Sequence, residues 1–242
     1  MIDLAGKRAF VTGGGRGIGH ATAVLLARAG AQVAVGYRSR KPAPAAHVIA
    51  AVRGDLGTIA GASKAVAEAI RALGGGLDIL VINHGVWPAD DVPVAKMTDE
   101  QWESTRRANL DAVIYVCRAA IPTITDGGTI VLVASTAGQR GEAFHTDYAA
   151  TKGAVIAITK SLAVELAPRI TVNCVAPGWV DTEMAAKPYA GDGRAAIEKA
   201  IPLRRVASAE DIAGPILFLC SPLARHITGE ILNVNGGSVL CG

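Results

Sequence analysis

The chain has 242 residues, half of them apolar and only 19% charged, with a formal net charge of +3. This length suits one large α/β domain with its own core, and the scattered basic residues predict no nucleic-acid partner and no anionic membrane surface. No apolar run is long enough for a membrane span, and the four cysteines and five histidines form no ligand cluster. We therefore expect a cytoplasmic protein with free thiols and no metal site.

The first elements are a strand, a glycine turn and a helix. Arg8–Thr12 predicts a short apolar strand, 13–19 reads GGGRGIG, and 18–29 predicts a helix that Gly30 ends. Glycines in this context let backbone N–H groups approach a pyrophosphate, and the helix N-terminus adds partial positive charge. The candidate cofactor-binding residues here are Gly13, Gly15, Arg16, Gly17, Ile18 and Gly19. The kinase-type phosphate loop is disfavoured, because no Lys-Ser or Lys-Thr pair follows the last glycine.

The second strand, Gln32–Tyr37, is followed by Arg38 where NAD-binding sites usually carry an acidic residue. Arg16 and Arg38 together suit a 2′-phosphate, so NADP(H) is favoured over NAD(H), although both could be ordinary surface arginines. Segment 39–47 contains two prolines and predicts a missing crossover helix before a third strand at 48–52. Asp55 and Leu56 could meet the adenine, or Asp55 could cap the helix expected at 59–73.

Strands and helices alternate through the rest of the chain. Further strands are expected at 79–83, 129–134, 170–176 and 230–234. A capping box at 98–101 opens a long helix to about 121, with Asn109 midway, and a second cap at 208–211 opens another to 219. The polar stretch 183–200 is expected to form a mobile substrate lid. The pattern predicts a single-domain Rossmann fold over 1–242: a doubly wound parallel sheet of about seven strands, helices on both faces.

The stretch 134–152 carries the chemistry. Ser135 follows a strand, and Tyr148 and Lys152 are four residues apart on a predicted helix, so they share one face. A nearby ammonium would lower the pKa of the phenol and make it a proton donor or acceptor near neutral pH. Alternatively, the pair is a surface helix contact worth a few tenths of a kcal/mol.

Taken in order, these motifs resemble the classical short-chain dehydrogenase/reductase family over nearly the whole chain. The resemblance rests on TGGGRGIG at 12–19, Asn83-x-Gly85, Asn109, Ser135, Tyr148-x-x-x-Lys152 and Pro177-Gly178 with Thr182. Within the family, the chain looks most like the 3-oxoacyl-[acyl-carrier-protein] reductase group, which GEILNVNGG at 229–237 also resembles. His84 departs from the pattern, since the family usually has alanine there. We interpret it as a buried, hydrogen-bonded histidine.

The resemblance implies roles for matching residues. Tyr148 would be the general acid in reduction, Lys152 would lower its pKa and hold the nicotinamide ribose, Ser135 would steady the substrate oxygen, and Asn109 would hold a water. The resemblance places Asn83, Gly85, Pro177, Gly178, Val180 and Thr182 against the cofactor. Substrate contacts are expected from Trp87, Gln139, Arg140, Phe144, His145, Trp179 and the lid. Family members are commonly tetramers, so a homotetramer or homodimer is expected, with Tyr115, Val116 and Ile156 as interface candidates.

Three functions remain open. The favoured one is an NADP(H)-dependent oxidoreductase that transfers hydride between the nicotinamide and a small ketone or secondary alcohol. The second is an NAD-dependent dehydrogenase of a secondary alcohol such as a polyol or sugar. The third, less favoured because all four catalytic residues are present, is a non-catalytic cofactor-binding protein on the same fold.

Overall fold

The structure is a computed structural model that describes residues 2–42 and 48–241. Seven parallel strands form one sheet in the order β3-β2-β1-β4-β5-β6-β7. The strands are β1 (Arg8–Thr12), β2 (Gln32–Tyr37), β3 (Val48–Arg53), β4 (Leu77–Ile82), β5 (Ile124–Val133), β6 (Ile170–Pro177) and β7 (Ile231–Val234). The predicted doubly wound sheet is confirmed. The two halves of the chain run outward from β1 and β4, which pair in register from Ala9–Ile79 to Thr12–Ile82.

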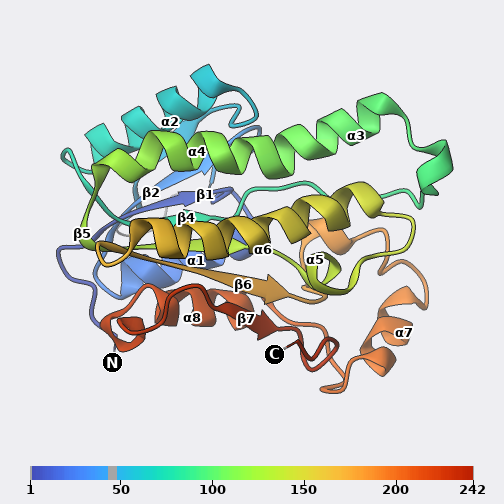
Figure 1. Ribbon diagram of the computed structural model, residues 1–242. Helices are drawn as coiled ribbons and strands as arrows, with labels where there is room; N and C mark the ends of the chain where they lie inside the picture. Colours follow the sequence, from blue (N-terminus) through green and yellow to red (C-terminus); the bar gives the residue numbers. More distant parts are fainter. Residues whose placement is uncertain (1, 43–47, 242) are drawn as a thin grey trace.

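Helices cover both faces of the sheet (Figure 1). On one face lie α1 (Gly17–Arg28) and α8 (Ala209–Leu219), which pack against each other through an apolar cluster that includes Leu26, Val33 and Ile212. On the other face lie α2 (Ile59–Ala72), α4 (Ala112–Ala120) and α6 (Thr146–Leu166), over Phe10, Leu80 and Ile130. The central strands are buried on both faces, as an all-parallel sheet requires.

The predicted helix from 98 to about 121 is interrupted. Thr98 caps α3 (Asp99–Arg106) by accepting a hydrogen bond from the Gln101 N–H, and a π-helical segment, Arg107–Asp111, then leads into α4. Single π turns inside α-helices are frequent at functional sites, and this one carries Asn109. Nothing in the apolar periodicity signalled it. The second predicted cap is confirmed, because Ser208 and Asp211 form a reciprocal capping box at the start of α8.

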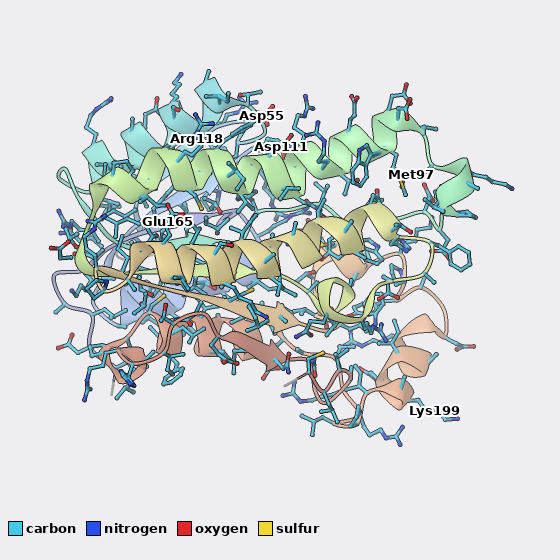
Figure 2. The ribbon with its side chains drawn as sticks, in the orientation of Figure 1. Asp55, Met97, Asp111, Arg118, Glu165 and Lys199 are labelled. Carbon is cyan, nitrogen blue, oxygen red and sulfur yellow. The ribbon has the colours of Figure 1, made fainter. Side chains whose placement is uncertain are left out.

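Two predicted connections need comment. Segment 39–47 lies partly outside the described residues, and its described part, 39–42, forms no helix. Asp55 is not the cap of α2: Thr58 takes that position, and Asp55 accepts a bond from the Gly57 N–H. The expected lid, 183–200, contains a 3-10 turn at Glu183–Ala185 and the helix α7 (Gly193–Ala200). Figure 2 shows Lys199 of α7 at the outer edge of the molecule.

Within residues 2–42 and 48–241, no helix is long and apolar enough to cross a membrane. The same residues bring together no group of three or more His, Cys, Asp or Glu side chains that could hold a metal ion.

Candidate active site

A cleft of about 330 Å³ opens at the carboxyl ends of the strands, where the chain order reverses between β1 and β4. Ligands bind at this switch point in open α/β sheets. The cleft brings together most of the predicted site residues: Gly13, Gly15, Arg16, Gly17, Ile18, Arg38, Asp55, Leu56, Asn83, Gly85, Ser135, Tyr148, Lys152, Pro177, Gly178, Val180 and Thr182. Gly19 and Asn109 do not line it, but each packs against a glycine that does, Gly13 and Gly85 respectively.

The glycine turn forms the floor of the cleft. Gly13 has a φ of +66°, a conformation that favours glycine, and a side chain at Gly19 would stand 2.3 Å from the Gly13 carbonyl oxygen. Arg16 is the N-cap of α1 and makes no side-chain capping bond. The first backbone N–H groups of α1 therefore have no intrahelical partner and no side-chain cap, which makes this end an anion site.

Three charged side chains meet beside the glycine turn. Arg16 Nη1 lies 2.7 Å from Glu183 Oε2, and Arg40 also pairs with this carboxylate. The side chains of Arg16 and Glu183 are each 54% exposed. Arg38, the arginine predicted for a 2′-phosphate, lines the same cleft. Arg40 was not predicted as a cofactor-binding residue, because it follows the predicted Arg38 and its partner, Glu183, is distant in sequence.

His84 lines the cleft next to Gly13 of the glycine turn. Its Nδ1 lies 2.8 Å from the Thr12 hydroxyl oxygen, while its Nε2 is buried with no hydrogen-bond partner among the described residues. Burial, and then the charge of Lys152, lowers the pKa of His84 to about 3, so the imidazole is neutral at physiological pH. This geometry matches the interpretation of a buried, hydrogen-bonded histidine.

Ser135, Tyr148 and Lys152 form the reacting end of the cleft. Ser135 lies two residues after the end of β5 and is the N-cap of a short helix, α5 (Thr136–Arg140), where its Oγ accepts from the Ala137 N–H at 3.1 Å. Tyr148 and Lys152 come from the first two turns of α6 and are only 8% and 4% exposed. The Lys152 Nζ donates to the Val133 carbonyl at 2.8 Å and stands 5.8 Å from the centre of the Tyr148 ring.

The expected acidification of Tyr148 is wrong for the protein by itself. Burial raises the pKa of the phenol to about 12; the Ser135 hydroxyl opposes this shift and Glu142 adds to it. Burial also lowers the pKa of Lys152 to about 8. The prediction failed because it counted the neighbouring cation and omitted desolvation, which here dominates both groups. At neutral pH Tyr148 is therefore a protonated phenol, ready to donate.

Asn109 braces the cleft wall from the π segment. Its Oδ1 accepts from the Val86 N–H at 2.7 Å and its Nδ2 donates to the Val86 carbonyl at 2.9 Å. A side chain at Gly85 would lie 3.2 Å from Asn109 Oδ1 and 3.5 Å from Lys152 Nζ, so these groups converge on one glycine. The amide thus fixes the strand end that carries Asn83 and Gly85.

Asp147 is a residue that sequence reasoning missed. It is fully buried, and its carboxylate accepts from the Thr105 hydroxyl at 2.8 Å, from the Gln101 side chain at 3.2 Å and from the Tyr148 N–H at 2.9 Å. It thereby ties α3 to the first turn of α6, next to the phenol. The aspartate beside Tyr148 was visible in the sequence, but its burial and its side-chain partners, Gln101 and Thr105, more than 40 positions away, were not.

The substrate end of the cleft is only partly as expected. Trp87, Arg140 and Trp179 line it, and the buried His145 stacks behind Trp87. Gln139 and Phe144 do not line it: Gln139 donates to Asn233 at 2.6 Å, and Phe144 is 51% exposed. Three residues of the lid, Glu183, Met184 and Ala185, also line the cleft.

Comparison with known proteins places the chain in a family. A family model described as enoyl-(acyl carrier protein) reductase matches residues 13–238. The chain is 38% identical to the 3-oxoacyl-[acyl-carrier-protein] reductase of Vibrio harveyi and 39% identical to that of Escherichia coli, with 98% of each chain covered in both comparisons.

Solved structures agree in fold. A short-chain dehydrogenase/reductase from Brucella melitensis superposes with a TM-score of 0.90 at 33% identity over 99% of both chains. A blue fluorescent protein from a metagenomic library, solved with NADPH, gives 0.88 at 35% identity over 98% of this chain and 100% of the other. A Burkholderia cenocepacia short-chain dehydrogenase, solved with NADP, gives 0.87 at 35% identity over 97% and 98%. This chain therefore belongs to the short-chain dehydrogenase/reductase family of oxidoreductases.

Proposed function

We propose that the protein is an NADP(H)-dependent reductase that converts a ketone into a secondary alcohol. The observation that carries this proposal is the meeting of the Tyr148 phenol, Ser135 and Lys152 at one end of the cleft whose other end receives the N-terminus of α1. The first end handles a proton, and the second binds a phosphate group.

The cleft fits a dinucleotide. The glycines that line it at 13, 15 and 17 would let a pyrophosphate approach backbone N–H groups, and Arg16, Arg38 and Arg40 supply cations for a 2′-phosphate. The strand ends at Asn83, Gly85 and Pro177–Thr182 would border the rest. The NADPH and NADP complexes of the two similar structures support this assignment. When bound, the nicotinamide supplies the hydride for the carbonyl carbon.

The chain's own residues handle the oxygen and the proton. Ser135 donates a hydrogen bond to the substrate carbonyl oxygen and orients it beside Tyr148. The phenol, protonated at neutral pH, gives its proton to that oxygen as negative charge develops there. The Lys152 ammonium, close behind, stabilises the resulting phenolate. Asn109 holds the Val86 backbone, in the segment after β4 that would border the cofactor, in place.

The remaining assignments concern the whole chain. The protein acts as one domain over 1–242, with 183–200 as a lid over the substrate. It works in the cytoplasm as a homotetramer or homodimer, which the similarity to 3-oxoacyl-[acyl-carrier-protein] reductases supports.

Nucleotide oxidation tests the cofactor and the reaction together. The purified protein is assayed with NADPH and with NADH against a 1,2-diketone and a 3-ketoester. We expect consumption of NADPH at a kcat/KM at least about tenfold above that of NADH, because one bidentate arginine–phosphate contact is worth about that much. A preference for NADH, together with faster turnover of secondary alcohols, would instead identify an NAD-dependent alcohol dehydrogenase.

Substitution of the acid separates catalysis from binding. Tyr148→Phe removes the proton donor and should lower kcat by about 10²- to 10⁴-fold, while the dissociation constant for NADPH stays within about twofold by fluorescence titration. Tyr115→Phe, in the middle of α4, is the matched control and should keep wild-type kcat. Retained turnover in Tyr148→Phe would remove this phenol from the mechanism, and nucleotide binding with no turnover in wild type would indicate a non-catalytic binding protein.

A further inference from the structure

Four of the ten aromatic side chains of this chain, Trp87, Tyr148, Trp179 and Tyr189, gather at one place. Aromatic residues make up 4% of the sequence, with three tryptophans in all. Two of these, Trp87 and Trp179, line the cleft beside Tyr148, and Trp179 contacts Tyr189 of the lid. The third, Trp102, lies on α3 and is 40% exposed. We call Trp87, Trp179 and Tyr189 the aromatic wall.

Trp87 is held in one orientation by the residues around it. Its ring stacks on the buried His145 at 4.0 Å between centroids and 17° between planes. It also meets the Tyr148 ring edge to face, at 4.6 Å and 78°. These are the arrangements that aromatic pairs prefer, so the indole is fixed before any ligand arrives. A fixed contact surface binds at a lower cost in conformational entropy.

The wall continues onto the lid. The centroids of Trp87 and Trp179 are 6.3 Å apart, and Tyr189 follows at 5.9 Å from Trp179. The guanidinium of Arg194 lies 5.4 Å from the Tyr189 ring and supports it from the lid side. Met184, also from the lid, adds a polarisable thioether to the cleft, and thioethers pack favourably on aromatic rings.

The two cations near this end are offset by neighbouring carboxylates. Arg140 and Lys187 were the two cations that could have received a carboxylate or phosphate. Arg140 pairs with Glu142 at 2.9 Å, and Lys187 pairs with Asp90. Both cations therefore already have carboxylate partners, and the cleft surface next to the phenol is aromatic.

We propose that the substrate is a ketone with a flat aromatic ring attached to, or one atom away from, its carbonyl carbon, and that Trp87 is the residue that selects it. This proposal rests on the proposed function, because the carbonyl must lie at Ser135 and Tyr148. A carbonyl held there places its substituent beside Trp87, whose ring is nearly perpendicular to that of Tyr148. A flat ring can then pack against Trp87 and Trp179 in the offset or edge-to-face geometry that a puckered or flexible group cannot match.

A matched pair of 3-ketoesters tests the selection. Ethyl benzoylacetate and its cyclohexyl counterpart, ethyl 3-cyclohexyl-3-oxopropanoate, have the same carbon skeleton and differ in flatness. The ratio of their kcat/KM values with NADPH is measured in wild type and in Trp87→Leu, Trp179→Leu and the surface control Trp102→Leu. Comparing ratios between variants cancels the intrinsic difference in reactivity between the two ketones.

We expect the phenyl-to-cyclohexyl ratio to fall about tenfold in Trp87→Leu, less in Trp179→Leu, and to stay unchanged in Trp102→Leu. Turnover of the cyclohexyl ester should persist in each variant, which shows that the site is intact. An unchanged ratio in Trp87→Leu would overturn the proposal.

Ligand binding without turnover gives a second measurement, independent of the reaction. The Trp102→Phe protein has only Trp87 and Trp179 as indole fluorophores, and acetophenone should quench them along a saturating curve. Cyclohexyl methyl ketone, whose ring is puckered, serves as the control and should not give a saturating curve. Purely linear quenching, like that of free N-acetyltryptophanamide, would refute the aromatic site. If neither ester is reduced with either nucleotide, the proposed function fails, while saturating quenching would still support the aromatic-ring site.

Discussion

Burial sets the protonation of Tyr148 and Lys152, because it disfavours the charged form of each side chain. The phenol is raised to about 12 and the ammonium is lowered to about 8. For reduction this is a useful pairing. The Tyr148 phenol keeps its proton at every physiological pH, and the Lys152 ammonium keeps its charge up to the mildly alkaline range.

The pH dependence of reduction should therefore follow Lys152 rather than Tyr148. Below about pH 8 the ammonium is charged and stabilises the phenolate that forms as the proton leaves; as the pH rises through about 8 this charge is lost, and kcat should fall. The phenol itself stays protonated until about pH 12. The measurement is kcat at saturating NADPH and ketone from pH 6 to 10, with circular dichroism at each pH to confirm folding. A profile that stays flat to pH 10 would contradict this assignment.

At the scale of elements, Asp147 joins the two helices that build the reacting end. Its carboxylate, fully buried, accepts three hydrogen bonds: from the side chains of Gln101 and Thr105 on α3, and from the Tyr148 backbone N–H. Removing it leaves those donors without partners, and unpaired buried donors are costly.

Asp147→Ala should lower the free energy of unfolding by about 3 kcal/mol. For a chain of this size, that corresponds to a fall in Tm of about 6 to 12 °C. The exposed Asp126→Ala is the control and should change stability by less than about 0.5 kcal/mol. Thermal unfolding followed by circular dichroism measures both. If Asp147→Ala unfolds with the wild-type Tm, the carboxylate does not hold α3 to α6.

A second link joins the lid to the glycine turn. Glu183, at the start of the lid, binds both Arg16 and Arg40, the cations proposed for the 2′-phosphate. A carboxylate and a phosphate cannot share these guanidinium groups without repulsion. Cofactor binding must therefore release Glu183 from them.

Glu183→Gln should bind NADPH severalfold more tightly, because the arginines no longer have to leave a carboxylate, whereas NADH affinity should change little. Glu198→Gln, on α7 of the same lid, is the control for general loss of a lid carboxylate. Titration calorimetry with both nucleotides gives the two dissociation constants. Equal tightening for NADH and NADPH would show that Glu183 acts on the lid and not on the 2′-phosphate.

The sequence predicted these elements with uneven success, for physical reasons. Strands, the glycine turn and the Ser208 cap depend on local patterns and lie close to their expected positions, although β5 begins at Ile124 and not at 129. The π segment at Asn109, the Asp147 network and the Arg40–Glu183 contact depend on tertiary partners, which one sequence does not reveal. The acidification of Tyr148 failed for a related reason, since its burial depends on Trp87, distant along the chain.

At the scale of the whole molecule, the order of motifs predicted both the doubly wound sheet and the position of the cleft. Residues that must meet come from the ends of different parallel strands, and the topology brings these ends to one edge. Side-chain pairing inside the cleft was not predictable in this way, and Gln139 and Phe144, expected to contact the substrate, do not line the cleft.

The outer surface of α3, α4 and α6 is the face that we expect to bury against further copies of the chain. α4 and α6 lie at the front of the molecule, with Arg118 and Glu165 labelled along them (Figure 2). Ile114 on α4 is 37% exposed and Val164 on α6 is 82% exposed, whereas a monomer gains nothing from apolar side chains there. The predicted candidates Tyr115 and Ile156 are partly buried against the core beneath them.

Multi-angle light scattering should accordingly give a mass near four times, or twice, the chain mass of 24.7 kDa. Val164→Glu should shift the distribution toward smaller species, because a carboxylate in an apolar interface must be desolvated without a partner. Leu223→Glu, an equally apolar side chain that is 67% exposed near the end of α8, is the matched control and should leave the mass unchanged. A wild-type protein that scatters as a monomer at micromolar concentration would refute the assembly. Equal dissociation by both substitutions would place the interface elsewhere.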